Sequence, residues 1–200
     1  MFRCISLAVA ALGVTTLPAL AHLDPGEHGS FAAGFSHPLF GTDHILAMIA
    51  VGLWAALLGP MLGRRALWLV PAAFVTTMAA GFAAAMLDLP LPFVEPVILA
   101  SVVVIGLLAA AALKVPTHAA MGMVGLFAFF HGHAHGSELG EAGAGAFAAG
   151  FIVATALLHA LGIALGLLLA RSLGTSRGRM ATRAAGAATA IGGLWLAFGG

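Results

Sequence analysis

The chain alternates between long apolar stretches and short polar links over most of its length. A helix of ~20 apolar residues is long enough to cross the hydrocarbon core of a bilayer. The apolar stretches are continuous and lack the period-two alternation of membrane strands. The pattern therefore predicts an all-α, polytopic membrane protein with a six-helix transmembrane bundle. The expected spans are residues 31–58, 66–87, 93–113, 116–135, 143–170 and 182–198.

The first 21 residues have the pattern of a cleaved signal peptide. Arg3 precedes a short apolar segment, and Ala19-Leu20-Ala21 matches a small-residue cleavage site. An uncleaved first span is the alternative. We expect residues 22–200 to form a single membrane domain beginning at His22. Cleavage also removes Cys4, the only cysteine, so a metal site in the mature chain must use nitrogen and oxygen ligands.

Composition supports the membrane prediction and excludes other classes. The chain is 62% hydrophobic and 8% charged, whereas a soluble domain carries roughly 25% charged residues. The net charge is +1 and no basic patch extends beyond the short links. We therefore expect the lipid bilayer as a partner, and no nucleic acid. The 27 glycines suit helices that pack closely in lipid.

Charge is sorted between the two ends of the predicted spans. After the signal, the basic residues follow spans one, three and five: Arg64, Arg65, Lys114, Arg171, Arg177, Arg179 and Arg183. The acidic residues at the opposite end are Asp24, Glu27, Asp88, Glu95, Glu138 and Glu141. By the positive-inside tendency the basic end is cytoplasmic, which agrees with the signal peptide. We expect a multi-pass protein of the bacterial inner membrane, with both mature termini in the periplasm.

Asp43 is the one acidic residue that escapes this sorting, because it lies well inside a predicted span and not near its end. His37 and His44 lie near it, seven residues apart, and so share one face of a helix. Ionisable groups at membrane depth cost several kcal/mol unless they are paired or functional. Pro38 and Gly41 between the two histidines are expected to bend or open the helix and to allow close approach. This segment is the first candidate metal site.

A second cluster ends span four. His131, His135 and Glu138 follow the i, i+4, i+7 spacing of one helix face, whereas His133 is expected to point away toward solvent. Imidazole and carboxylate groups suit nickel, cobalt, zinc, iron or copper. We expect this cluster to form the mouth of a metal path above Asp43, with His22 and His28 assisting metal capture.

An internal echo adds a further candidate. Residues 29–35 (GSFAAGF) match residues 145–151 (GAFAAGF) at six of seven positions with an offset of 116. The echo is either a structural repeat, as is common in transporters, or a chance match between Ala/Gly-rich segments. The same offset aligns Asp43 with His159. A repeat would place these two residues at similar depth, which makes His159 a candidate metal residue and a partner for Asp43.

Two segments resemble the signatures of the HupE/UreJ family of bacterial nickel/cobalt transporters. They are His37-Pro38-x-x-Gly41-x-Asp43-His44-x-x-x-Met48-x-x-Val51-Gly52-x-x-Ala55 and His131-Gly-x-Ala-His135-Gly-x-Glu138. The resemblance implies import of Ni²⁺ or Co²⁺ across the inner membrane, supplying hydrogenase, urease or cobalamin synthesis. It also implies that His37, Asp43 and His44 are the essential metal-handling residues.

Three functions fit these residues. The first is a permease that is not an enzyme, holds no cofactor and carries Ni²⁺ or Co²⁺; no P-loop sequence occurs. The second is a membrane-embedded His/Asp metalloenzyme, a hydrolase or hydroxylase, which needs a tightly held metal and a water position. The third is an accessory subunit whose histidines bridge helices. Nickel and cobalt accept the same ligands, so both stay open.

Overall fold

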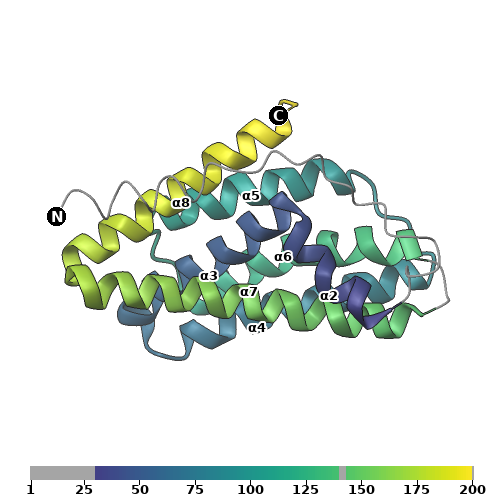
Figure 1. Cartoon of the computed structure of the whole chain (residues 1–200), viewed down its shortest axis with the longest axis horizontal. Helices are drawn as coiled ribbons and strands as arrows, with labels where there is room; N and C mark the ends of the chain where they lie inside the picture. Colours follow the sequence, from purple (N-terminus) through teal and green to yellow (C-terminus); the bar gives the residue numbers. More distant parts are fainter. Residues whose placement is uncertain (1–29, 140–142, 200) are drawn as a thin grey trace.

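The computed structural model describes residues 30–139 and 143–199, which form seven helices and no strand (Figure 1). The all-α prediction is confirmed for these residues. The predicted signal peptide, His22 and His28 lie outside them, as do the side chains of Glu138 and Leu139. The helices are α2 (Phe31–Phe40), α3 (Thr42–Leu62), α4 (Ala66–Met86), α5 (Val94–Ala111), α6 (Thr117–Leu139), α7 (Ala144–Leu173) and α8 (Thr175–Ala197).

Four of the helices, α3, α4, α5 and α7, are long and apolar enough to cross a membrane. Of the six predicted spans, those at α6 and α8 do not meet this criterion, because α6 carries four histidines and α8 three arginines. The exterior is nevertheless apolar. Trp68, Leu126, Leu157, Ile191 and Trp195 are all more than half exposed. Large apolar side chains on the surface of a helical bundle are typical of a protein whose solvent is lipid.

The first predicted span is two helices rather than one. Pro38 lies inside α2, and three residues later Gly41 adopts an extended conformation, with φ −78° and ψ 114°. Proline removes a helical hydrogen bond and glycine has low helix propensity, so the chain leaves the helix at this point. The bend expected from the sequence is therefore a complete break at Gly41.

The sixth span was predicted to begin at residue 182, but α8 begins at Thr175. The link after α7 is Gly174 alone, with φ +76°. Arg177 and Arg179, which suggested a longer polar link, are exposed on the first turns of α8. Arginine is a good helix former, so its charge marks exposure here and not a loop.

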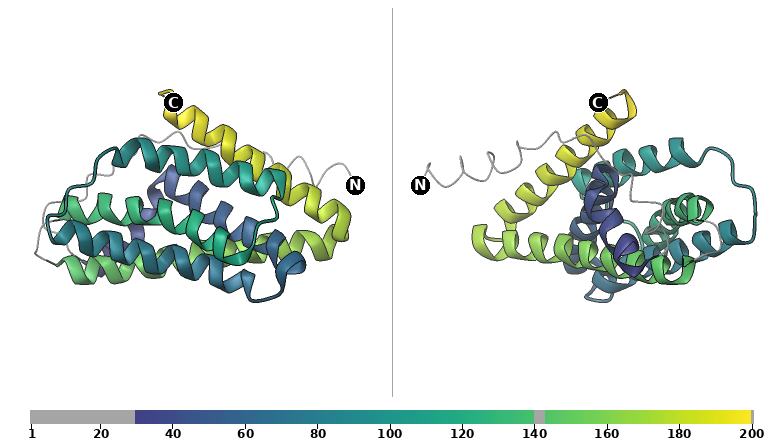
Figure 2. Two further views of the ribbon diagram at one scale, coloured as in Figure 1. Left: turned by 180° about the vertical axis from the view of Figure 1, so that it is seen from behind. Right: turned by 45° about the vertical axis from the view of Figure 1, so that its right-hand side comes forward.

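Glycine contacts show which helices run in the same direction. Gly34 meets Phe147, and further along both elements Gly52 meets Gly162, so the α2–α3 segment and α7 are parallel. In α5 and α8 the order is opposite: Gly106 meets Ala190, whereas Val102, earlier in α5, meets Gly193, later in α8. These two helices are therefore antiparallel. Consistent with this, the links 63–65 and 174 lie at one end of the molecule, and the α4–α5 link lies at the other (Figures 1 and 2).

The described part of the sequence echo is a packing interface. A Cβ on Gly34 would overlap the backbone of Phe147, and a Cβ on Gly150 would overlap the backbone of Phe31. Under the offset of 116, Gly34 corresponds to Gly150 and Phe31 to Phe147. The two contacts are therefore reciprocal, as in parallel repeats related by a two-fold axis along the helices. This interface favours a structural repeat over a chance match.

Candidate metal site

The helix break brings two histidines to one place. His37 lies in the last turn of α2, and His44 lies in the first turn of α3. Their rings approach edge to face, with centroids 5.3 Å apart. The sequence predicted that one helix face would carry both residues. Instead two helix ends present them across the extended Gly41.

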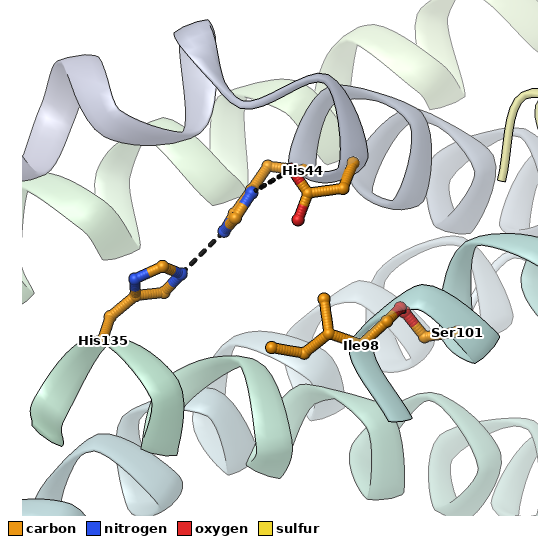
Figure 3. Close-up of polar contacts among 5 residues, drawn as sticks. His44, Ile98, Ser101 and His135 are labelled. Atoms are coloured by element: carbon orange, nitrogen blue, oxygen red, sulfur yellow. Dashed lines mark hydrogen bonds and ion pairs between the residues drawn. The ribbon is translucent and has the colours of Figure 1, made fainter. Parts of the chain in front are cut away.

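His135 of α6 completes a cluster with these two histidines. One ring nitrogen from each of His37, His44 and His135 lies within 4.8 Å of the other two. The Nε2 atoms of His44 and His135 are 2.7 Å apart and point toward one another (Figure 3). His44 and His135 are buried, and His37 is half-buried. Three neutral imidazoles that converge from three helices form a donor set suited to nickel, cobalt, zinc or copper.

Asp43 supports this cluster through His44. Its Oδ1 atom lies 2.9 Å from Nδ1 of His44. An ionised carboxylate only accepts hydrogen bonds, so His44 donates through Nδ1 and presents the lone pair of Nε2 to the cluster. A carboxylate behind a histidine fixes its tautomer and raises its basicity as a ligand. Asp43 thus orients a candidate ligand and adds a negative charge beside the cluster.

Gly41 leaves the space that this pair occupies. A Cβ on residue 41 would lie 2.6 Å from Nδ1 of His44 and 3.1 Å from Oδ1 of Asp43. The backbone angles of Gly41 are open to any residue. The glycine is therefore needed for room and not for its conformation.

Two further histidines lie deeper along the bundle. His131 is fully buried, and its ring lies 5.6 Å from that of His44. His159 of α7 is also buried, and its Nδ1 lies 2.8 Å from the carbonyl oxygen of Met48. The prediction that Asp43 and His159 are partners is wrong, because Asp43 pairs with His44 and His159 contacts a residue more than one turn further along α3.

The second sequence cluster is not a separate mouth. His135 belongs to the same cluster as His37 and His44, and His131 lies one turn deeper in α6. His133 does point away from them, but it is buried, and its Nε2 lies 2.7 Å from the carbonyl oxygen of Leu89. Solvent exposure of His133 was therefore predicted wrongly; this residue anchors the α4–α5 link. Glu138, His22 and His28 remain predictions outside the described side chains.

Aromatic rings that the sequence did not single out enclose the cluster. Phe151 lies 4.8 Å from His135 and 6.0 Å from His44, measured between ring centroids. Phe147 lies 6.0 Å from His37. Both phenylalanines belong to the second copy of the echo, which was the one available signal for them. They surround the polar nitrogens with apolar surface, and so strengthen electrostatic interactions there.

The fold and this site define a class: a polytopic helical membrane protein with a buried cluster of candidate metal ligands. The family model described as HupE / UreJ protein matches residues 9–196. Protein HupE of Rhizobium leguminosarum bv. viciae is 44% identical over 156 residues, covering 77% of this chain and 80% of that protein. No solved structure matches the chain. The chain belongs to the HupE/UreJ family, which is associated with nickel/cobalt uptake and is considered a family of transporters rather than enzymes.

Proposed function

We propose that this protein imports Ni²⁺ or Co²⁺ across the bacterial inner membrane and that His37, His44 and His135 bind the ion during passage. The observation that carries the proposal is the convergence of their three ring nitrogens within 4.8 Å, inside a bundle with an apolar exterior. Membership of the family supports the choice of ion. The imported metal would supply hydrogenase, urease or cobalamin synthesis.

The cluster has features suited to transit. Three neutral imidazoles hold a divalent ion less firmly than three thiolates would, and conduction requires a site from which the ion can leave. The carboxylate of Asp43, 2.9 Å from Nδ1 of His44, offsets part of the ion's charge. This lowers the free-energy cost of bringing a dication into a low dielectric. His37 is the most exposed of the three, so we assign it the first contact with an entering ion. Glu138, His22 and His28 are proposed to assist capture before it.

We further propose six membrane crossings, with α2 and α3 together forming the first. The parallel and antiparallel contacts of the helices are consistent with this path. Exposed basic residues lie at the links on one end, and Asp88 and Glu95 are exposed at the other. The positive-inside tendency makes the basic end cytoplasmic, and the mature termini periplasmic.

The test is accumulation of radioactive nickel by cells at trace concentration, comparing the wild type with His44→Ala and the double variant His37→Ala/His135→Ala. His118→Ala is the matched control, because His118 is exposed near the opposite end of α6. We expect uptake to fall to the level of cells lacking the protein in both cluster variants and to stay unchanged in the control. Wild-type uptake by a membrane-inserted cluster variant would exclude this site. Metal that stays bound through purification in chelator would instead favour the metalloenzyme.

A further inference from the structure

His131 and His159 share an unusual hydrogen-bonding state. The Nδ1 atom of His131 lies 3.0 Å from the carbonyl oxygen of Phe127, and that of His159 lies 2.8 Å from the carbonyl oxygen of Met48. A carbonyl only accepts, so both imidazoles donate through Nδ1. When the ring is neutral, its Nε2 atom then carries a lone pair. Neither Nε2 atom has a hydrogen-bond partner among the described residues.

These two nitrogen atoms lower the stability of the fold. Both side chains are almost fully buried, at 0% exposure for His131 and 1% for His159. A buried polar atom without a partner costs about 1–3 kcal/mol. Apolar side chains would fill the same space without that cost. Two such atoms near a cluster of candidate metal ligands call for a function that uses the lone pairs.

The two rings contact the same aromatic side chain, and the ring of His131 also contacts the first cluster. The ring of His131 lies 5.6 Å from that of His44, and both His131 and His159 contact the ring of Phe74, at 5.7 Å and 4.9 Å. The order in the bundle is therefore His44, then His131, then Phe74 with His159. One turn before His159, the hydroxyl of Thr155 lies 3.7 Å from the sulfur of Met78, which adds two polar atoms beside this route.

We propose that His131 and His159 form a second, inner metal-binding station for a divalent transition-metal ion, using the Nε2 atom of each residue. The proposal rests on the transport function proposed above and extends it, because an ion leaving the first cluster would pass on to this His131–His159 station. The tautomer of both residues is already set by a backbone carbonyl, so they accept the ion without moving a proton. A neutral carbonyl raises the basicity of an imidazole less than the carboxylate of Asp43 does. The inner station therefore binds more weakly than the first, as onward release requires.

The first experiment measures binding of Co²⁺ to the purified wild-type protein in detergent, by equilibrium dialysis and by visible absorption. We expect two ions per chain, one bound more weakly than the other. The variants His131→Asn and His159→Asn place an amide N–H near the Nδ1 position and so retain the bond to the carbonyl, while they remove Nε2. In both, the weaker ion is lost, whereas the affinity for the tighter ion changes by less than about threefold, well below the loss expected when a ligand or its support is removed.

His133→Gln is the matched control, because His133 is also buried on α6 and its Nδ1 has no hydrogen-bond partner among the described residues. In that part of the chain, His133 takes no part in the ring contacts of the cluster. Glutamine retains a donor for the carbonyl of Leu89. We expect two bound ions in this variant. A single Co²⁺ per wild-type chain, or an unchanged weaker ion in both asparagine variants, would overturn the inner station.

Nickel uptake by cells separates the two proposals. If the proposed function holds and the inner station exists, His131→Asn and His159→Asn reduce uptake at least about tenfold, although they retain the first site. If those variants take up nickel like the wild type, the inner station is wrong and the transport function stands. If wild-type cells take up no more nickel than cells lacking the protein, the transport function is wrong, and the two-ion stoichiometry still tests the inner station.

Discussion

His44 and His135 face each other through their Nε2 atoms at 2.7 Å, although they are 91 positions apart in the chain. Because His44 donates the hydrogen bond to Asp43 through Nδ1–H, His135 supplies the proton between the two Nε2 atoms when both rings are neutral. A metal ion that binds both nitrogens must replace that proton. His135 must then carry its proton on Nδ1 instead.

This relationship predicts that His44 and His135 act as a unit. We expect His44→Ala and His135→Ala each to abolish saturable nickel uptake, and the double variant to be no worse than either single variant. Residues that share one interaction are not additive. The check is a double-mutant cycle on nickel affinity in purified protein, and independent, additive losses would contradict a shared ion.

Asp43→Asn tests the supporting role of the carboxylate. Asparagine preserves the size of the side chain and an oxygen that accepts from His44, but it removes the negative charge. We expect nickel affinity to fall about 10- to 100-fold, as for other partners behind a metal-bound histidine. The amount of protein in the membrane should stay the same. Loss of the inserted protein without loss of affinity per molecule would show that Asp43 is structural.

Gly41→Ala tests whether the site needs the space at residue 41 or the backbone flexibility of glycine. The backbone angles suit alanine, but the new methyl group would meet Nδ1 of His44. We expect the His44 side chain to turn away, with nickel uptake reduced and thermal stability nearly unchanged. Gly122→Ala is the control, because a Cβ there meets nothing within 4 Å. Equal uptake by both variants would mean that the Asp43–His44 pair is dispensable.

The reciprocal interface between α2 and α7 predicts matched losses of stability. Alanine at Gly34 or at Gly150 pushes a methyl group into the backbone of the other helix, which we expect to destabilise the protein by ~1–3 kcal/mol or more. Gly145→Ala lies in the same helix but in open space. Thermal unfolding in detergent should show a lower midpoint for Gly34→Ala and Gly150→Ala only.

The proposed topology can be tested with single cysteines. In a background in which Cys4 is replaced, Asp88→Cys and Ser176→Cys place a thiol at opposite ends of the bundle, both on exposed positions. We expect a membrane-impermeant maleimide to label residue 88 in intact spheroplasts, and residue 176 only after the membrane is permeabilised. The reverse pattern would invert the orientation.

The sequence predicted the helices well and the spatial relations of the site less well. Hydropathy located most of the helix ends within a few residues, because bilayer thickness limits the length of a span. Hydropathy did not predict the break at Gly41, because apolar content does not report where a helix is interrupted. It did not predict the early start of α8 either, because arginine is compatible with a helix. Spacing on one helix correctly grouped His131 with His135. It could not show that His135 joins His37 and His44, because that contact depends on how α6 packs against α3.

The buried network was out of reach for a physical reason. The carbonyl groups of Met48 and Phe127 fix the tautomers of His159 and His131, and every residue has such a carbonyl. A sequence therefore gives no sign of which ones accept. The offset of the echo led to the wrong pairing of Asp43 with His159, because the residues of α3 and α7 that contact each other are shifted relative to the aligned positions.

The three histidines of the first cluster come from three separate helices, α2, α3 and α6. An ion held by all three would cross-link these helices without a covalent bond. The free energy of binding would then stabilise one arrangement of the bundle over any in which α2, α3 or α6 has moved apart from the others. Ion occupancy and helix arrangement would become linked variables, so a mutation that loosens any of the three helices should alter metal affinity without touching a ligand.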